Sequence, residues 1–248
     1  MLSLSGRFVP IVTPLTDDGS GVSEVRLGRI IRRAMDLGAQ GFIVGTETGE
    51  VGALSFGERK HMAELVVRAT QGIVPVLVNA SSLNTSASLD LAQHAMRHGA
   101  RAIVLTPPYY GSFETREVTS HFRTVIHYSQ AACIAVDPDR MLNKEALEQL
   151  NLGARFELAE GMGAAPPTTD RFRFGDFRVS PAYHFTFTPV PEVDALLDRF
   201  SGAKVVKGLF EEMDLELGPV RQPLLALDMK DGFQALLALR ALSEGVDA

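Results

Sequence analysis

Two polar segments directly follow apolar runs, and their residue types suit anion binding and proton transfer. The first, residues 44–50, reads Val-Gly-Thr-Glu-Thr-Gly-Glu after the apolar run 41–44. The second, residues 106–110, reads Thr-Pro-Pro-Tyr-Tyr after the apolar run 102–105. Backbone N–H groups at a strand-to-helix turn stabilise an anion, and a tyrosine hydroxyl transfers protons where its neighbours present a proton chain. Both segments are therefore candidate parts of a site.

Apolar strands alternate with amphipathic helices over the first 150 residues, and this alternation places both segments at strand ends. Within residues 23–37, for example, apolar side chains recur with the i, i+3, i+4, i+7 spacing of one helix face. Short apolar strands separated by such helices are typical of a parallel sheet that helices cover. The expected strands are 8–12, 41–44, 74–78, 102–105, 132–136 and 156–162, and the expected helices are 23–37, 56–70, 86–98, 115–130 and 143–150.

The alternation fails after residue 162. Residues 163–167, Gly-Ala-Ala-Pro-Pro, exclude a helix, and residues 185–188 resemble a strand only a few residues after residues 178–180. A parallel crossover needs a dozen or more residues, so either this pair forms a hairpin-like departure or the seventh outer helix is lost. Five phenylalanines concentrate apolar surface here, from which we expect a homo-oligomer, a dimer or tetramer. They are Phe172, Phe174, Phe177, Phe185 and Phe187.

Composition limits the kinds of partner. The 248 residues are 46% hydrophobic and 22% charged, which suits one large α/β domain. A net charge of -6 and a pI near 5.5 argue against nucleic acid or acidic lipid as partners, and no apolar stretch approaches the ~20 residues that span a membrane. Cys133 is the single cysteine, which excludes an internal disulfide framework, and the N-terminal sequence does not resemble a signal peptide. We therefore expect a cytoplasmic protein with a small soluble ligand.

The two polar segments give the chain its resemblance to the dihydrodipicolinate synthase / N-acetylneuraminate lyase family, whose members carry Gly-Thr-Thr-Gly-Glu and Pro-Tyr-Tyr at these places. The resemblance covers residues 1 to about 163 well and the tail loosely, because the chain is shortened between Gly163 and Lys204. It implies an α/β fold: a TIM (β/α)8-type barrel, irregular or truncated around strands 7 and 8, with C-terminal helices. Residues 1–200 would be the barrel and residues 201–248 a helical segment packed on it, in one domain.

The resemblance also implies roles for individual residues. In the family, hydroxyl and N–H groups of the first loop bind the carboxylate of a keto acid, which implies the same for Thr48 and Gly49. The alignment places Glu47 where the family has its first threonine, so a carboxylate replaces a proton-relaying hydroxyl. Tyr110 matches a proton-shuttling tyrosine of the family. Arg140 keeps a Pro-x-Arg spacing and is a candidate carboxylate anchor.

Two residues that the family's imine mechanism uses are absent. Ala135 stands where the family has a second relay tyrosine, and Gly163 stands where its lysine forms a Schiff base with the keto carbon. Lys204 would replace that lysine only if residues 201–206 formed a barrel strand. The lysines are Lys60, Lys144, Lys204, Lys207 and Lys230. Imine chemistry is therefore not expected.

No metal and no cofactor are expected. His94 and His98 have the i, i+4 spacing of two metal ligands on a helix, but the sequence shows no third ligand, so a solvated helix face is the simpler interpretation.

Three functional hypotheses remain open. The first is a lyase-type or hydratase-type enzyme that acts on a small oxo- or hydroxy-acid by acid–base chemistry, with Tyr110 as proton donor, Glu47 or Asp137 as base, and Thr48 or Arg140 as anchor. The second is a catalytically inactive paralogue that binds a metabolite or a protein partner. The third is an imine-forming lyase whose lysine lies elsewhere, and the combined loss of the relay tyrosine and the lysine counts against it.

Overall fold

Six short parallel strands follow one another in the order that the alternation of the sequence predicts. The computed structural model describes residues 4–150, 155–162 and 166–245. Each strand pairs with the next, so that the sheet runs β6-β5-β4-β3-β2-β1 before continuing to β8 and β7. These strands are β1 Gly6–Pro10, β2 Gly41–Val44, β3 Val76–Asn79, β4 Ala102–Leu105, β5 Cys133–Ala135 and β6 Phe156–Leu158.

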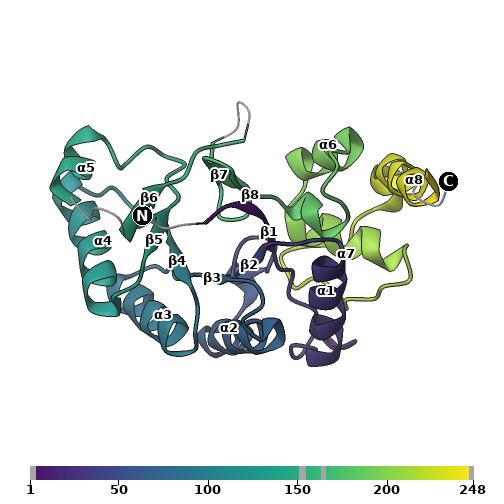
Figure 1. Ribbon diagram of the computed structural model, residues 1–248, viewed down its shortest axis with the longest axis horizontal. Helices are drawn as coiled ribbons and strands as arrows, with labels where there is room; N and C mark the ends of the chain where they lie inside the picture. The colour runs from purple at the N-terminus through teal and green to yellow at the C-terminus, as the bar shows by residue number, and fades with distance from the viewer. Residues whose placement is uncertain (1–3, 151–154, 163–165, 246–248) are drawn as a thin grey trace.

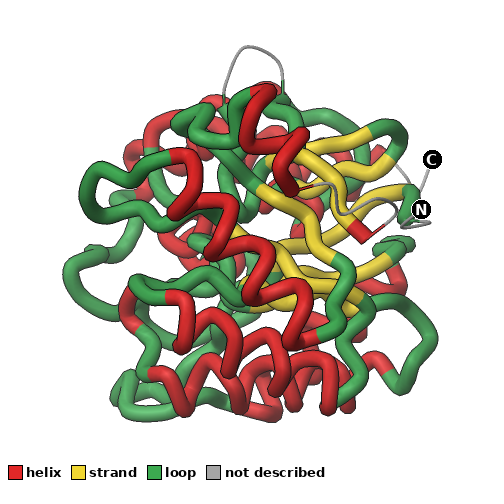
Figure 2. The backbone as a smooth tube through the Cα atoms, turned by 90° about the vertical axis from the view of Figure 1, so that its left-hand side faces the viewer, coloured by secondary structure: helices red, strands yellow, loops and turns green. Residues whose placement is uncertain are grey.

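The connecting helices cover the outside of the sheet. In Figure 1, helices α2 to α5 follow one another around the outer side of the curled sheet, and Figure 2 shows helices in front of the strands from the side. α2 begins with a capping box, in which Ser55 and Glu58 satisfy each other's backbone N–H groups. The helices are α1 Glu24–Asp36, α2 Phe56–Thr70, α3 Thr85–Arg97, α4 Thr115–Ser129 and α5 Lys144–Leu150. The predicted apolar face of α1 is buried: Leu27, Ile30, Ile31 and Ala34.

A β-hairpin replaces the last regular units of the barrel. β7 (Phe172–Phe174) and β8 (Phe177–Val179) pair antiparallel, and β8 continues the sheet in parallel with β1. Glu160, just after β6, and Arg173 in β7 exchange two backbone hydrogen bonds of 2.7 and 2.9 Å, which brings the two edges of the curled sheet together. The irregular barrel-type α/β fold is thus confirmed, and the hairpin is formed by residues 172–174 and 177–179 instead of the expected pair 178–180 and 185–188.

Aromatic side chains from this hairpin fill the interior of the barrel. Phe172 and Phe177 are fully buried among the inward-facing side chains of the strands, and the Phe177 and Phe8 rings lie 4.5 Å apart. Phe185 is also buried, in the layer between sheet and helices. Phe172, Phe177 and Phe185 therefore do not present a free apolar surface, because the monomer's own core uses them. The homo-oligomer stays a prediction, but these three buried side chains no longer support it.

The chain after the hairpin is helical. Residues 185–188 do not form the expected strand, because β8 pairs with β7 and not with them. They follow a short 3-10 helix, η3 (Pro181–His184). Three helices complete the chain: α6 Pro191–Arg199, α7 Gly202–Glu211 and α8 Met229–Gly245. They gather on the side of the molecule away from α4 and α5 (Figure 1). None of the helices in the described ranges is both long and apolar enough to cross a membrane.

Candidate functional site

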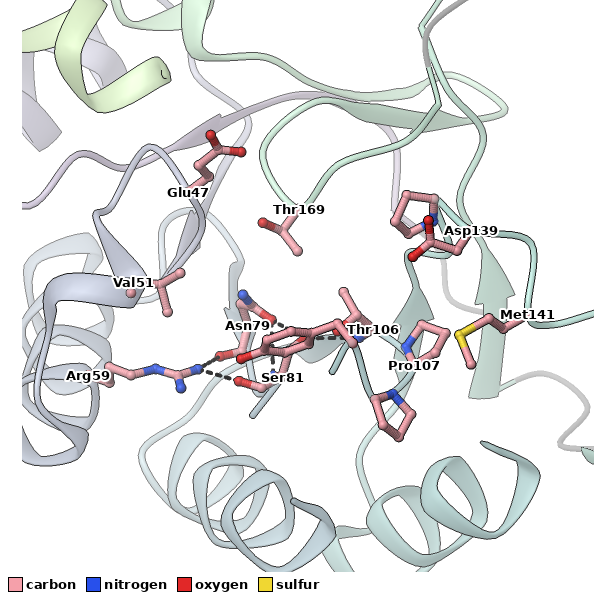
Figure 3. Close-up of a pocket in the computed structure, with 14 residues that line it drawn as sticks. Glu47, Val51, Arg59, Asn79, Ser81, Thr106, Pro107, Asp139, Met141 and Thr169 are labelled. Atoms are coloured by element: carbon pink, nitrogen blue, oxygen red, sulfur yellow. Dashed lines mark hydrogen bonds between the residues drawn. The ribbon is translucent and has the colours of Figure 1, made fainter. Parts of the chain in front are cut away.

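A cavity of about 380 Å³ opens where strands β2 to β5 end (Figure 3). TIM-type barrels carry their functional groups at this end of the strands. Polar groups from α2 and from the loops after β2, β3, β4 and β5 converge on it. Its lining residues are Glu47, Val51, Gly52, Arg59, Asn79, Ser81, Thr106, Pro107, Pro108, Tyr109, Pro138, Asp139, Met141 and Thr169.

Arg59 brings a half-buried cation to this cavity. Its Nη2 donates hydrogen bonds to the carbonyl oxygens of Asn79 (3.1 Å) and Ser81 (2.9 Å), which fix the guanidinium against the end of β3 (Figure 3). Its Nε is buried without a hydrogen-bond partner, and no carboxylate of the described chain pairs with it. Burial lowers the pKa of Arg59, but an arginine stays charged in proteins. A half-buried guanidinium without a carboxylate partner favours an anionic ligand.

Side-chain hydrogen bonds hold the floor of the cavity in place. Ser81 Oγ donates to Asn79 Oδ1 at 2.6 Å, Asn79 Nδ2 donates to the Gly45 carbonyl at 2.7 Å, and the Thr106 N–H donates to Ser81 Oγ at 2.9 Å. Thr106 Oγ1 is buried and has no hydrogen-bond partner among the described residues.

Glu47 lies on the wall of the cavity next to the end of β2 (Figure 3). Burial, and secondly the negative charge of Asp170, raise the pKa of this carboxyl. A carboxyl with a raised pKa exchanges protons nearer neutral pH than an ordinary glutamate does. Glu47 is the one predicted catalytic residue that lines the cavity.

Thr48 and Gly49 lie behind this wall, and their hydrogen-bonding groups are already used. The Thr48 N–H and Oγ1 both donate to Asp170 Oδ2, at 3.1 and 2.7 Å. The Gly49 N–H donates to the Thr46 carbonyl, and the Gly49 carbonyl accepts from Thr13 Oγ1 at 2.7 Å. In this conformation neither residue presents a free donor to the cavity.

Asp137 and Arg140 lie together but outside the cavity. Both line a separate, open depression beyond β5. Asp137 is buried and accepts the N–H groups of Met141 (3.0 Å) and Leu142 (2.6 Å), so its carboxylate holds the following loop. Arg140 is exposed and has a φ of 55°, in the left-handed region.

The two tyrosines of the second polar segment lie in different places relative to the cavity. Tyr109 lines the cavity, whereas Tyr110, the predicted proton donor, is 63% exposed and does not line it.

Among the described residues that line the cavity there is no lysine. Residues 201–206 belong to α7 and its N-cap and not to a strand, so Lys204 is not on the barrel wall. Lys207 is buried against Glu50, and Lys60 pairs with Asp90 on the outer helices. The Gly163 position lies outside the described residues.

Sequence reasoning missed Arg59, Asn79 and Ser81 as cavity residues, whereas Thr106 belongs to the second quoted segment, although it had no role of its own there. Asn79 and Ser81 follow the third apolar strand as the two quoted segments follow theirs, and this position was the available signal. Arg59 carried no signal, since one arginine in an amphipathic helix is ordinary.

Comparisons with known proteins agree with the geometry. The model of the "Dihydrodipicolinate synthetase family" matches residues 3–150. The 4-hydroxy-tetrahydrodipicolinate synthase of Bartonella bacilliformis is 35% identical over 122 residues, which are 49% of this chain and 41% of that protein. That of Methanothrix thermoacetophila is 38% identical over 124 residues, 50% of this chain and 41% of the relative. The matched part therefore spans less than half the length of these relatives.

Solved structures share the fold over nearly the whole chain. A putative dihydrodipicolinate synthetase from Pseudomonas aeruginosa has a TM-score of 0.79 at 21% identity, covering 96% of this chain and 99% of that one. The N-acetylneuraminate lyase of Proteus mirabilis has a TM-score of 0.78 at 17% identity, covering 96% and 98%. An E. coli K12 prophage protein of the dihydrodipicolinic acid synthase family, solved with pyruvate, has a TM-score of 0.72 at 16% identity, covering 97% and 99%.

Proposed function

The chain belongs to the dihydrodipicolinate synthetase family, and from this premise we propose that it is a lyase-type or hydratase-type enzyme for a small oxo- or hydroxy-acid that works without an imine. One observation carries the proposal. Glu47, a carboxyl with a raised pKa, and Arg59, a half-buried guanidinium without a carboxylate partner, line the same cavity, and no lysine of the described chain lines it.

Arg59 would hold the carboxylate of the acid. Its Nε has no protein partner, and its Nη2 is fixed by two carbonyl oxygens, so the cation is already oriented before a ligand arrives. An arginine–carboxylate pair with little water around it is among the stronger polar interactions in proteins.

Glu47 would move the proton. As a carboxylate it takes a proton from the carbon next to the carbonyl: the C–H bond breaks, and its electron pair moves to the carbonyl oxygen as an enolate. The Thr106 hydroxyl, which has no protein partner, would donate a hydrogen bond to that oxygen. Glu47 would then return the proton to a β-hydroxyl group, which leaves as water, and the electron balance closes without an external redox partner.

The relatives support the substrate class. One structural neighbour was solved with pyruvate, and another is an N-acetylneuraminate lyase. We transfer to this chain only the class of small oxo-acid, which the cavity of about 380 Å³ fits in size.

A second candidate function, a non-catalytic paralogue that binds a metabolite, rests on a different observation. Asp170 uses the hydrogen-bond donors of Thr48, and Tyr110 is exposed, so two parts of the expected machinery do not face the cavity.

Proton exchange separates the two candidates. Two- to six-carbon oxo- and hydroxy-acids are incubated with the protein in D2O, and loss of the proton next to the carbonyl is followed by NMR. We expect exchange with wild type, loss of exchange with retained binding in Glu47→Gln, and loss of binding in Arg59→Met. Glu148→Gln, on the exposed side of α5, is the matched control. Binding without exchange would favour the paralogue, and exchange that survives Glu47→Gln would refute Glu47 as the base.

A further inference from the structure

The loop after β2 already holds a carboxylate, and it belongs to the chain itself. The Thr48 N–H and hydroxyl converge on one oxygen of Asp170, at 3.1 and 2.7 Å. The other oxygen of Asp170 accepts from Thr168 Oγ1 at 2.8 Å. We propose that Asp170 is a built-in ligand that closes this carboxylate site, so that a substrate carboxylate is directed to Arg59.

The site has no space for a second carboxylate. Thr48 is fully buried and Asp170 is 5% exposed. α7 begins directly against them: a Cβ added at Gly202 would lie 2.2 Å from Thr48 Oγ1 and 3.2 Å from Asp170 Oδ2. An external carboxylate therefore reaches Thr48 only if Asp170 leaves.

The segment that carries Asp170 is held on both sides. Thr168 and Arg171 exchange two backbone hydrogen bonds of 3.1 and 3.2 Å around it. The Arg171 side chain pairs with Asp198 of α6 and lies 3.9 Å from Asp194 of the same helix. The irregular segment before β7 thus places Asp170 in the loop as part of the fold.

This closure determines how a ligand lies in the cavity. Glu47 stands between the cavity and the closed site, since it also lines the small space formed by Asp170 and Gly202. Among the described residues that line the main cavity, Arg59 is the only cation for the carboxylate of a small oxo-acid, whose reacting carbon then points toward Glu47. This inference rests on the proposed function for the identity of the ligand, but its test does not need turnover.

Calorimetric titration with pyruvate and with acetate tests the closure. We expect wild type and Thr48→Val to bind with the same affinity, because Thr48 is occupied. Asp170→Ala opens the site and should bind acetate at least tenfold more tightly, and Thr48→Val added to Asp170→Ala should remove that gain. Asp170→Asn keeps an acceptor for Thr48 and should show no gain, and Asp198→Ala is the control for loss of a nearby charge.

Tenfold weaker binding in Thr48→Val alone would overturn the proposal, because it would show that the external ligand uses Thr48 in the wild type. If Asp170→Ala fails to fold, a crystal structure of the wild type soaked in pyruvate tests the same point. Asp170 should remain hydrogen-bonded to Thr48. Pyruvate bound to Thr48 in place of Asp170 would refute the closure. Failure of the proposed function would appear separately, as binding that is insensitive to Arg59→Met.

A second inference rests on an independent cluster between α2 and α3. Glu64 of α2 faces His94 and His98 of α3, and their ligand atoms all lie within 4.8 Å of one another. His94 Nε2 is 2.8 Å and His98 Nε2 is 3.9 Å from Glu64 Oε1. We infer that these three side chains form a surface site for a borderline divalent ion such as Zn²⁺.

The chemistry and the exposure of the ligands both suit such an ion. Two imidazoles and a carboxylate are ligands that Zn²⁺ accepts at about 2.0–2.2 Å, with water in the open position. The His94 side chain is 12% exposed, whereas those of His98 and Glu64 are 42% and 38% exposed, so an ion can approach the cluster from the solvent side. Lys60, which pairs with Asp90, is the nearby positive charge that opposes the ion.

Calorimetry with zinc chloride tests this site. We expect one ion per chain with a dissociation constant on the order of micromolar, weakened at least tenfold in His98→Ala and in Glu64→Gln. His61 is an exposed histidine of α2 outside this cluster, so His61→Ala should bind zinc like the wild type. Unchanged zinc affinity in His98→Ala and Glu64→Gln, or binding only at millimolar zinc, would overturn the inference.

Discussion

Replacing Lys207 by methionine should destabilise the fold strongly, because it breaks the ion pair that holds the polar loop to the C-terminal helices. Lys207 Nζ lies 2.5 Å from Glu50 Oε1 and donates to the Pro219 carbonyl at 2.6 Å. Glu50 Oε2 accepts the N–H of Arg221 at 2.6 Å. Through Glu50, which directly follows Gly49, α7 and the segment before α8 fix the loop that carries Glu47.

The size of the effect follows from burial. The Lys207 side chain is 5% exposed and the Glu50 side chain 1%, so the methionine variant leaves a carboxylate buried without its cation. Burial, which outweighs the opposing effect of Glu50, lowers the pKa of Lys207, as expected for a charge held away from water. Removing one partner of a buried pair costs about 3–5 kcal/mol of unfolding free energy. For a chain of this size that corresponds to a fall in Tm of roughly 6–20 °C.

Urea unfolding at pH 7, followed by circular dichroism, measures this loss. The double variant with Lys207→Met and Glu50→Gln should recover part of it, because neither charge then stays buried alone. Lys144→Met is the control: its side chain is 91% exposed, and it should change the free energy of unfolding by less than about 0.5 kcal/mol. A loss below about 1 kcal/mol in Lys207→Met would refute the structural role of the pair.

Three further predictions concern the cavity and the assembly. Arg59→Met should weaken oxo-acid binding by about one to two powers of ten in calorimetry, because one charged hydrogen-bonding group contributes about 1.5–3 kcal/mol; an unchanged affinity would place the ligand elsewhere. The affinity for the oxo-acid should rise as pH falls through the raised pKa of Glu47, since protonation removes a negative charge beside the bound acid. Glu47→Gln should abolish this pH dependence. A pH dependence of the affinity that survives in this variant would assign the titration to another group. A homo-oligomer should use the exposed apolar side chains of α8, so Phe233→Glu, at a residue 52% exposed, should shift sedimentation toward the monomer; a wild-type monomer at micromolar concentration would contradict this.

The strands and helices up to β6 follow from local sequence. Strands β2, β3, β4 and β5 are buried, largely apolar runs, and the helices repeat apolar residues on one face, so hydrophobic periodicity predicts them; β6, Phe-Glu-Leu, is partly exposed. The hairpin of β7 and β8 is harder to predict. Phe172, Arg173 and Phe174 alternate with strand period, but residues 185–188 resemble a second strand more than residues 177–179 do, and the structure pairs β7 with β8 across the Gly175-Asp176 turn.

The site was predictable only in part, because its decisive contacts join distant parts of the chain. The sequence predicts Thr48 as a donor to a substrate carboxylate, whereas in the structure it donates to Asp170, which stands 122 residues later in a segment with no pattern of its own. Likewise, His94 and His98 were visible as a pair, whereas Glu64 becomes a neighbour only when α2 packs beside α3. Spacing along the chain reveals neighbours on one element but not those that the fold supplies.

Borohydride trapping with pyruvate tests most directly whether the protein works without an imine. The protein is incubated with excess pyruvate and sodium borohydride, and its intact mass is measured, with a lysine-dependent aldolase as the positive control. The mass of this protein should remain unchanged, because none of its lysines within the described structure lines the cavity. A stable pyruvate adduct, mapped by peptide analysis to any of Lys60, Lys144, Lys204, Lys207 or Lys230, would contradict this and restore the imine mechanism.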